Sequence, residues 1–295
     1  MTETAAQESH RPNVTAEIGC NHNGEMAIAR ELISLAAGFA KANVAKFQKR
    51  SPRELLSSKQ YHTSHPSPMH AYGATYGAHR EFLEFSVDEH RQLQEWCAES
   101  GIEYSTSVWD LTSAREITEL SPKLIKIPSA CNTHLEMLGY LCDHFPGEIH
   151  VSLGMTSRAE EEQLLGLLEA KQRARDVVLY ACTSGYPVPF DDICLLEIRR
   201  LRDTYGSCVR AIGFSGHHLG IAVDMAAYTL GARWIERHLT CDRTWKGTDH
   251  AVSLEPDGLR RLVRDLEAMS RALAAKSQEI LPIERVQRDK LKYGQ

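Results

Sequence analysis

Several common features are missing from this chain of 295 residues, and each absence excludes a class of protein. The eight cysteines include no Cys-x-x-Cys pair, which argues against a structural zinc site. No apolar run approaches the roughly 18 residues of a membrane span, and residues 1–13 lack the basic-then-apolar pattern of a secretion signal. We therefore expect a cytoplasmic protein with reduced thiols and no membrane partner.

An excess of positive charge is also missing. The formal net charge is -5, so the sequence offers no electrostatic footprint for nucleic acid. No Gly-x-Gly-x-x-Gly motif follows the first expected strand, which argues against a dinucleotide-binding sheet. The composition is 42% hydrophobic and 25% charged, as in a globular enzyme with a sizeable core. An anionic substrate would thus be bound by a few local cations.

Short β-branched runs alternate with longer amphipathic runs, which predicts βα units and a parallel sheet. The expected strands are residues 14–18, 44–47, 102–105, 124–127, 148–152, 177–181, 209–214 and 234–238. The expected helices are residues 26–40, 87–100, 111–119, 134–143, 158–173, 191–204, 220–230 and 256–272. Strict alternation of this kind predicts an α/β fold, a TIM (β/α)8 barrel, over residues 1–273. Ser86 and Ser157 are the expected N-caps of two of the helices.

Two segments interrupt the alternation. Residues 50–85 form a long insertion rich in His, Ser, Pro, Tyr and Gly, and such insertions are usually binding segments or disordered ones. The charged tail, residues 274–295, is expected to pack on the barrel or to lead to a linker.

Polar residues follow every expected strand, at the end of the barrel where TIM-barrel enzymes hold their active sites. In strand order they are Glu17 with Asn21 and His22, Lys46 with Gln48, Thr106 with Ser107, Lys126 with Ser129, Ser152 with Gly154, Thr183 with Ser184, Ser215 with His217, and Glu236 with His238. Two lysines among several hydroxyls suit a ligand that carries a phosphate and a carboxylate. The alternative is that both lysines form structural ion pairs.

Two histidines stand at the ends of adjacent strands. As neutral imidazoles, His217 and His238 would suit a divalent metal, with Mn²⁺ preferred and Mg²⁺ or Co²⁺ as alternatives. Such a metal could polarise a carbonyl group. The alternative is that each histidine only completes strand-end hydrogen bonds. Glu236 shares the strand face of His238 and could orient a ligand or act as an acid–base group.

The chain contains, in one order, the segments EIGCNHNG, AKFQK, LIKIPSA, VSLGMTS, YACTSGYP, IGFSGHHLGIA, ERHLT and WKGTDHAVSLEP. Over residues 14–291 these segments resemble the N-acetylneuraminate (sialic acid) synthase family. TYGAHREFLEFS and LPIERVQRDKL resemble its animal-type branch. The resemblance implies a TIM barrel that joins phosphoenolpyruvate to an N-acylated hexosamine or its 6-phosphate, giving a 2-keto-3-deoxy sugar acid and phosphate. It also implies a homodimer as the expected assembly.

The resemblance and the strand-end positions together give a set of expected site residues. The metal ligands are His217 and His238, and the catalytic residues are Glu17, Lys46, Glu236 and Asp249. The expected substrate contacts are Gln48, Thr106, Lys126, Ser129, Cys131, Ser152, Ser184, Tyr186, Ser215 and Tyr76. In the implied mechanism the metal polarises the aldehyde, the enol carbon attacks it, and water captures the resulting oxocarbenium. Glu17 is the candidate for activating that water or stabilising the cation.

Two departures from the family pattern affect the expected substrate. The family carries Glu or Asp where this chain has Cys131, so we expect a changed contact to the sugar. The alternative is that Cys131 is a small buried thiol that only fills space. Family members also continue into an antifreeze-like domain that covers the partner's site, and this sequence does not contain it. We expect the insertion from Tyr61 to Arg80, with Tyr72, Tyr76 and His79, to replace part of that cover.

Three other functions remain open at this stage. A class I aldolase would use Lys126 as a Schiff base. A metal-dependent TIM-barrel hydrolase usually has His-x-His at its first strand, where this chain has CNHN. The third is a catalytically inactive binding barrel.

Overall fold

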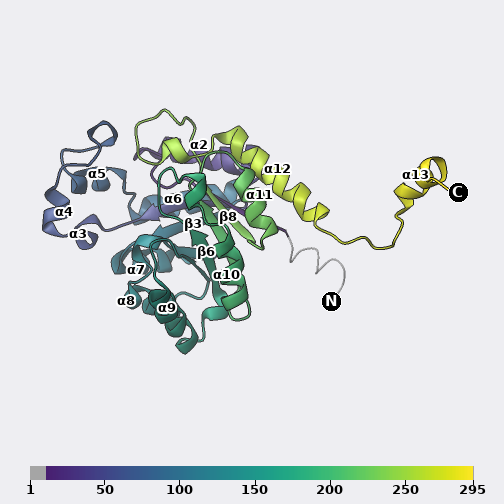
Figure 1. Ribbon diagram of the computed structural model, residues 1–295. Coiled ribbons are helices and arrows are strands. Elements are labelled where there is room, and N and C mark those ends of the chain that lie inside the picture. Colours follow the sequence, from purple (N-terminus) through teal and green to yellow (C-terminus); the bar gives the residue numbers. More distant parts are fainter. Residues whose placement is uncertain (1–10, 295) are drawn as a thin grey trace.

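The computed structural model describes residues 11–294, and its centre is a closed barrel of eight parallel strands (Figure 1). Each strand pairs with its sequence neighbours, and β8 pairs with β1 to close the barrel. The strands are β1 (Asn13–Glu17), β2 (Val44–Lys49), β3 (Glu103–Val108), β4 (Leu124–Ile127), β5 (Glu148–Ser152), β6 (Val177–Cys182), β7 (Ala211–Gly216) and β8 (Trp234–His238). The predicted TIM barrel is confirmed; residues 1–10 and Gln295 lie outside the described part.

The helices alternate with the strands and surround the barrel. They are α2 (Met26–Ser34), α6 (Val87–Ser100), α7 (Leu111–Leu120), α8 (Leu135–His144), α9 (Arg158–Ala170), α10 (Leu196–Tyr205), α11 (Ala222–Thr229) and α12 (Pro256–Ala272). The expected helix 26–40 continues from α2 into a π-helix, η1 (Leu35–Ala40), and the expected helix 191–204 divides into η5 (Phe190–Asp192) and α10. Short 3-10 turns η3 (Ser129–Cys131), η4 (Ala174–Asp176) and η6 (His250–Val252) complete the connections.

The insertion after β2 is mostly helical. It contains α3 (Pro52–Leu55), α4 (Ser58–His62), η2 (Pro68–His70) and α5 (Tyr76–Leu83). Its return to the barrel is fixed by local capping, because the Thr75 hydroxyl accepts a hydrogen bond from the Ala78 backbone at the start of α5. The insertion is therefore a folded segment rather than a structureless loop.

Strand β7 begins two residues later than the sequence predicted. Val209 is apolar and β-branched, but its backbone N–H donates to the Tyr205 carbonyl at 3.0 Å and so belongs to the turn after α10. The strand consequently runs on to Gly216 and delivers His217 directly at the barrel mouth.

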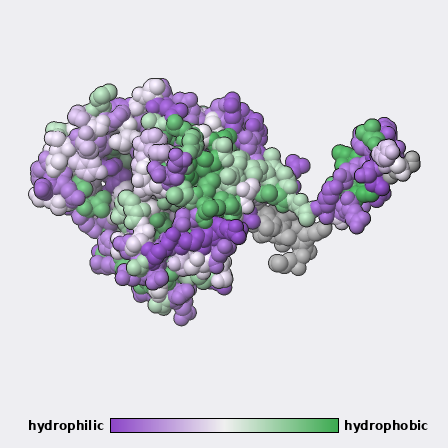
Figure 2. Space-filling view, in the orientation of Figure 1, coloured by the Kyte–Doolittle hydropathy of each residue, from purple (hydrophilic) through white to green (hydrophobic). Residues whose placement is uncertain are grey.

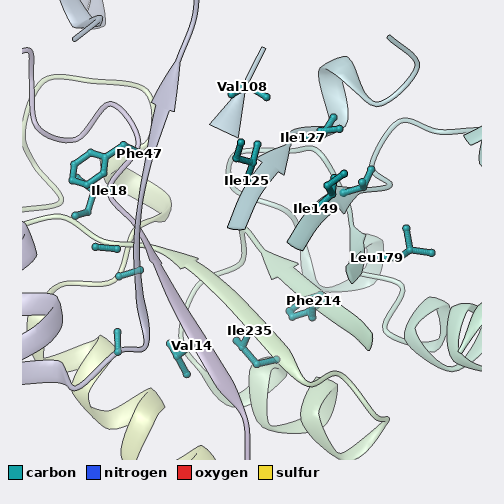
Figure 3. Close-up of a cluster of buried hydrophobic side chains, with 14 of the residues drawn as sticks. Val14, Ile18, Phe47, Val108, Ile125, Ile127, Ile149, Leu179, Phe214 and Ile235 are labelled. Carbon is teal, nitrogen blue, oxygen red and sulfur yellow. The ribbon is translucent and has the colours of Figure 1, made fainter. Parts of the chain in front are cut away.

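The hydrophobic core lies between the strands and the helices. Ile125, Ile149, Leu179, Phe214 and Ile235 point outward from successive strands and are at most 3% exposed (Figure 3). Burial of one such side chain contributes about 1.5–3 kcal/mol. Because strand side chains alternate, the opposite face of each strand points into the barrel, and there the residues are largely polar.

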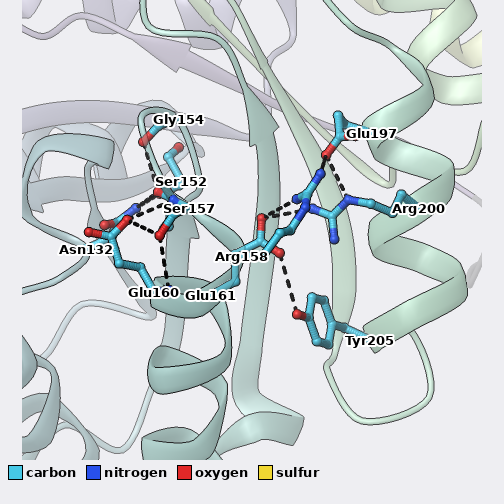
Figure 4. A network of polar contacts seen from close by, with 11 residues as sticks. Asn132, Ser152, Gly154, Ser157, Arg158, Glu160, Glu161, Glu197, Arg200 and Tyr205 are labelled. Atoms are coloured by element: carbon cyan, nitrogen blue, oxygen red, sulfur yellow. Dashed lines mark hydrogen bonds and ion pairs between the residues drawn. The ribbon is translucent and has the colours of Figure 1, made fainter.

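The two expected serine N-caps are confirmed. Ser86 and Ser157 each accept a hydrogen bond from the backbone three residues later, and Glu89 and Glu160 complete the reciprocal bonds. Figure 4 shows the Ser157–Glu160 cap beside the end of β5. The cap thus fixes α9 directly after the loop that carries Gly154.

The C-terminal tail contributes nothing to the core. Its helix α13 (Pro282–Leu291) contains no buried residue and stands apart from the barrel, with polar and apolar side chains both exposed (Figures 1 and 2). Within residues 11–294, no helix is both long and apolar enough to cross a membrane.

Candidate active site at the carboxyl ends of the strands

A cavity of about 690 Å³ opens at the carboxyl ends of the barrel strands. Most of the expected site residues lie on its wall: Glu17, Lys46, Gln48, Tyr76, Lys126, Ser129, Ser152, Ser184, Tyr186, Ser215, His217, Glu236, His238 and Asp249. They come from seven of the eight strand ends and from two long segments. The strand order of a closed barrel brings them together although up to 232 positions separate them in the sequence, as 249 minus 17 gives.

Two lysines and two carboxylates form a continuous row at the bottom of the cavity. Lys46 Nζ lies 2.9 Å from Glu17 Oε2 and 3.3 Å from Glu236 Oε1, and Lys126 Nζ lies 3.1 Å from Glu236 Oε2. None of the four side chains is more than 8% exposed. The charges are paired within the protein, so an incoming dianion would have to compete with Glu236 for both lysines.

Burial and neighbouring charges shift the pKa values of Glu17, Lys126 and Glu236 in different directions. Burial raises the pKa of Glu17 to about 7, although the Lys46 ammonium acts against this change. Burial lowers the pKa of Lys126 to about 8, with Glu236 opposing it. For Glu236, burial acts upward but the two ammonium groups outweigh it and hold its pKa below the usual range. Glu17 is therefore the carboxyl that can exchange a proton near neutral pH.

The position of the Glu17 carboxylate is fixed from a second side. Gln48 Nε2 donates to Glu17 Oε1 at 2.7 Å, and Gln48 Oε1 accepts from Arg50 Nη2. The guanidinium of Arg50 in turn lies over the Trp109 ring, 4.2 Å from its centre. The Gln48 amide is thus oriented by Arg50 so that its N–H group faces Glu17.

A set of hydroxyl groups surrounds the Lys126 side of the cavity. Ser129 Oγ accepts from the Gly154 backbone N–H at 3.0 Å. Asn132 Nδ2 donates to the Ser152 carbonyl at 2.8 Å (Figure 4). A Cβ on Gly154 would lie 2.4 Å from Ser184 Oγ and 2.7 Å from Ser129 Oγ, so only glycine leaves this space open. Hydroxyls and loop N–H groups beside an ammonium form a suitable cradle for a phosphate.

The two strand-end histidines face each other across the mouth of the cavity. Their ring centres are 5.6 Å apart. His217 Nδ1 lies 3.1 Å from the Thr183 carbonyl, which fixes the proton on Nδ1 and leaves the lone pair on Nε2. The His217 side chain also forms a hydrogen bond with Cys182. Among the described residues, His238 Nδ1 is buried and finds no hydrogen-bond partner. The two imidazoles fit a divalent transition metal, and since no third His, Cys, Asp or Glu of residues 11–294 forms a metal-binding group with them, other ligands would come from water or substrate.

The roof of the cavity is built by the insertion and by the loop after β8. Tyr72 Oη donates to the Lys246 carbonyl at 2.5 Å, and the Gly247 N–H donates to His70 Nδ1 at 3.1 Å. These contacts bring Tyr76 and Asp249 onto the wall of the same cavity. The predicted role of the insertion as a partial cover agrees with this placement, although what it contacts during catalysis stays a prediction.

Two expected substrate contacts lie elsewhere. Thr106 is fully buried on the outer face of β3, next to Tyr104, and it is its neighbour Ser107 that lines the cavity and accepts from Lys46 Nζ at 3.0 Å. Successive strand residues point to opposite faces, so an error of one residue moves the hydroxyl from the cavity to the helix layer.

Cys131 is the second correction. Its side chain belongs to the hydrophobic core and is 5% exposed, and it does not line the cavity. Burial raises the pKa of its thiol to about 12. The 3-10 turn η3 directs Ser129 into the cavity and turns Cys131 away from it. The expected place of Cys131 on the cavity wall is therefore corrected, and its position agrees with the alternative that the thiol fills space in the core.

Sequence reasoning missed several residues of the cavity wall. Arg50, Trp109, Cys182, Arg80 and His70 all line it. Cys182 ends β6 and could have been found from the strand-end rule, had that strand been extended by one residue. Arg50 and Trp109 follow strands β2 and β3 but carried no motif, so only their contact in the folded chain reveals them.

Comparison with known proteins now identifies the family. The NeuB family model matches residues 32–278, and the chain is 34% identical over 278 residues to N-acetylneuraminate-9-phosphate synthase of Homo sapiens, which covers 94% of this chain and 76% of that protein. The chain belongs to the NeuB family. It is 31% identical to the N,N'-diacetyllegionaminic acid synthase of Campylobacter jejuni, over 88% of this chain and 77% of the relative.

The fold of this NeuB-family chain is also that of solved synthases. The sialic acid synthetase of Leptospira borgpetersenii, solved in complex with citrate, superposes with a TM-score of 0.80 at 27% identity, covering 96% of this chain and 93% of the other. The chain is thus an enzyme of the sialic acid synthase type.

Proposed function

We propose that this NeuB-family enzyme condenses phosphoenolpyruvate with a sugar aldehyde, with a divalent metal at His217 and His238, and releases a 2-keto-3-deoxy sugar acid and phosphate. The observation that carries the proposal is the arrangement of one cavity. A row of buried lysines and carboxylates lies beside a hydroxyl cradle, in the same cavity as two strand-end imidazoles.

The two ends of phosphoenolpyruvate match the two lysines. Lys126, with Ser129, Ser152, Ser184 and Ser215, would hold the phosphate, and Lys46 would lie near the carboxylate. Ser215 already donates to Glu236 Oε1 at 3.1 Å, and Lys126 to Glu236 Oε2, so Glu236 keeps both groups in place before the ligand enters. Ligand binding would exchange these contacts for contacts to phosphate oxygens.

A metal bound by the two imidazoles would supply Lewis-acid polarisation of the aldehyde oxygen. The new bond forms between C3 of phosphoenolpyruvate and the aldehyde carbon, and an oxocarbenium remains at C2. Glu17 takes a proton from the water that adds to C2, which its pKa of about 7 allows at neutral pH. Cleavage of the bond between C2 and the bridging oxygen then gives the keto group and free phosphate. Of the two protons of the added water, one ends on the former aldehyde oxygen, which becomes a hydroxyl, and the other on the phosphate.

The direct test measures phosphate release from phosphoenolpyruvate across a panel of aldoses, with and without Mn²⁺. The expected result is release that requires both an aldose and the metal. With ¹⁸O in the bridging oxygen, the label should leave with the phosphate. Label that stays in the keto acid would mean P–O cleavage and would refute the mechanism.

One observation favours a second chemistry. The pKa of Lys126, lowered by burial to about 8, would suit a Schiff-base lysine. Lys126 is, however, held by Glu236 and lies 3.3 Å from the centre of the Tyr180 ring, inside the phosphate cradle. Borohydride treatment with pyruvate separates the two, because our proposal expects no covalent modification of Lys126.

A further inference from the structure

A buried network outside the cavity joins the two strand ends that carry the histidines. Arg237 lies between Glu236 and His238 on β8, on the opposite face of the strand, and is 1% exposed. Its Nη2 donates to the His218 carbonyl at 2.6 Å, and its Nη1 donates to the Gly220 carbonyl at 2.8 Å. Both carbonyls belong to the loop that directly follows His217.

The Arg237 guanidinium has a buried counter-charge on a third element. Asp224 in α11 accepts from Arg237 Nη1, and its side chain is fully buried. His218 completes the network, with Nε2 lying 3.0 Å from Arg237 Nη1 and 3.3 Å from Asp224 Oδ2. Gly216 makes room for it, since a Cβ there would lie 2.8 Å from the His218 ring.

Stability alone does not account for this network. Asp224 Oδ1, Arg237 Nε and His218 Nδ1 are buried and have no hydrogen-bond partner within residues 11–294. An incompletely satisfied buried ion pair is no more stabilising than well-packed apolar residues of the same volume. The role of the network therefore has to be sought in the loop backbone that Arg237 holds, at His218 and Gly220.

The network lies where the hydrogen-bond ladder between β7 and β8 ends. The last register pair between β7 and β8 is Gly216 with Arg237, so the ladder ends just before His217 and His238. Beyond that pair, the Arg237 fork holds the backbone of His218 and Gly220, and the Thr183 carbonyl holds the His217 ring. The separation of the two imidazoles thus depends on Arg237.

We propose that Arg237, supported by Asp224 and His218, is a positioning residue that sets the geometry of His217 and His238 and so their affinity for a divalent cation. The inference rests on the metal site proposed above. It assigns Arg237 no contact with substrate, because it does not line the active-site cavity.

The test is the affinity of the intact chain for Mn²⁺, measured by titration with the EPR signal of free Mn²⁺. Arg237→Lys keeps the charge but loses the planar fork that holds two carbonyls and a carboxylate at once. We expect its dissociation constant for Mn²⁺ to rise by about 10–100-fold. Phosphoenolpyruvate affinity without metal should stay unchanged, since Lys46, Lys126 and the hydroxyl cradle are untouched.

Arg173 offers a matched control. Its guanidinium also binds loop carbonyls, those of Cys142, Phe145 and Gly147, and pairs with Asp176. Arg173 itself lies in the loop between α9 and β6, at the opposite end of the barrel. Arg173→Lys should lower the melting temperature and leave Mn²⁺ affinity as in the wild type. The comparison separates positioning of the histidines from general loss of stability.

A second variant keeps the test decisive if Arg237→Lys does not fold. Asp224→Asn retains an acceptor oxygen for Arg237 and removes only the charge, so we expect it to fold and to weaken Mn²⁺ binding by a smaller factor. Folded variants that bind Mn²⁺ as the wild type does would overturn the inference while leaving the metal site intact. A wild type that binds no Mn²⁺ would overturn the metal site as well.

Discussion

Glu236 couples the two lysines of the cavity, and its neighbours determine which group in the row titrates near neutral pH. It lies within 3.3 Å of both ammonium groups, which keeps it anionic, while Glu17 has only Lys46 as a cationic partner. Two carboxyls in one row therefore differ in protonation because of their partners. This division fits a reaction in which one carboxylate holds cations and the other moves a proton.

Replacing Gln48 by Leu should shift the pH profile of kcat/KM to higher pH. The hydrogen bond from Gln48 lowers the pKa of Glu17, so its loss raises that pKa further above its ordinary value. When Glu17 acts as a base, kcat/KM falls as the pH drops through about 7, which gives the pH profile an acidic limb. In Gln48→Leu this acidic limb should lie at higher pH. Gln94→Leu, whose amide binds only the Leu120 carbonyl, should not shift the limb. An unshifted limb in Gln48→Leu would contradict the role of Glu17.

Removal of either imidazole should abolish metal binding. His217→Ala and His238→Ala should each lose most bound Mn²⁺ and nearly all turnover while remaining folded, because both side chains stand at strand ends rather than in the hydrophobic core. His144→Ala, on the exposed end of α8, serves as the control. Full Mn²⁺ occupancy in the double variant would rule the assignment out.

At the scale of single residues, the sequence located most residues of the cavity wall. It did not determine in every case which face of a strand or turn points into the cavity. Glu17, Lys46 and Glu236 could be predicted because strands of known register put alternate residues inside the barrel. Thr106 and Ser107 both stood at the expected end of β3, but Thr106 was the expected substrate contact. The observed strand, Glu103–Val108, puts Ser107 on the cavity face instead. The position of Cys131 could not be predicted for another reason. The direction of a side chain in a 3-10 turn has no periodic signal in the sequence.

Among the secondary-structure elements, those that carry cavity residues begin or end at well-defined local signals. The capping box of Ser157 and Glu160 starts α9 directly after the loop of Ser152 and Gly154, and Gly154 in turn leaves room for the hydroxyl cradle. The insertion after β2 combines local and distant signals. Ser57 and Thr75 cap two of its small helices, but the contacts from Tyr72 and His70 to the loop after β8 hold it over the cavity.

Loss of the Ser157 cap should cost stability without changing the chemistry. Ser157→Ala removes the acceptor for the Glu160 N–H, and we expect the free energy of unfolding in urea to fall by about 1 kcal/mol. KM for phosphoenolpyruvate should stay the same, because the Ser157 side chain does not line the cavity. Ser270→Ala, an exposed helical serine outside any cap, should change stability by much less. A large KM effect would show that the cap also orders the cradle.

On the scale of the whole molecule, the barrel and the tail are energetically separate. The core lies between strands and helices within residues 14–266, whereas α13 contributes no buried residue. The tail was expected to pack on the barrel or to lead to a linker, and its helix stands apart from the barrel (Figure 1). Its function stays a prediction.

Deletion of residues 274–295 should therefore leave the barrel unaffected. We expect the melting temperature and kcat/KM for phosphoenolpyruvate to match those of the full chain, because no apolar side chain of α13 loses a buried contact. Thermal denaturation and steady-state kinetics measure both. A fall of several degrees in the melting temperature would mean that the tail packs on the barrel in solution.

The sequence by itself determined the barrel, the family, and the kinds of groups at the strand ends. These follow from local information: hydrophobic periods, serine caps and ordered motifs within short segments. Only the tertiary structure decided the face of β3, the burial of Cys131, the folding of the insertion into a roof, and the Arg237 network. Each of these depends on contacts between residues far apart in the chain, such as Tyr72 with Lys246 or Arg50 with Trp109. Such contacts are set by how whole elements pack, and no local pattern encodes them.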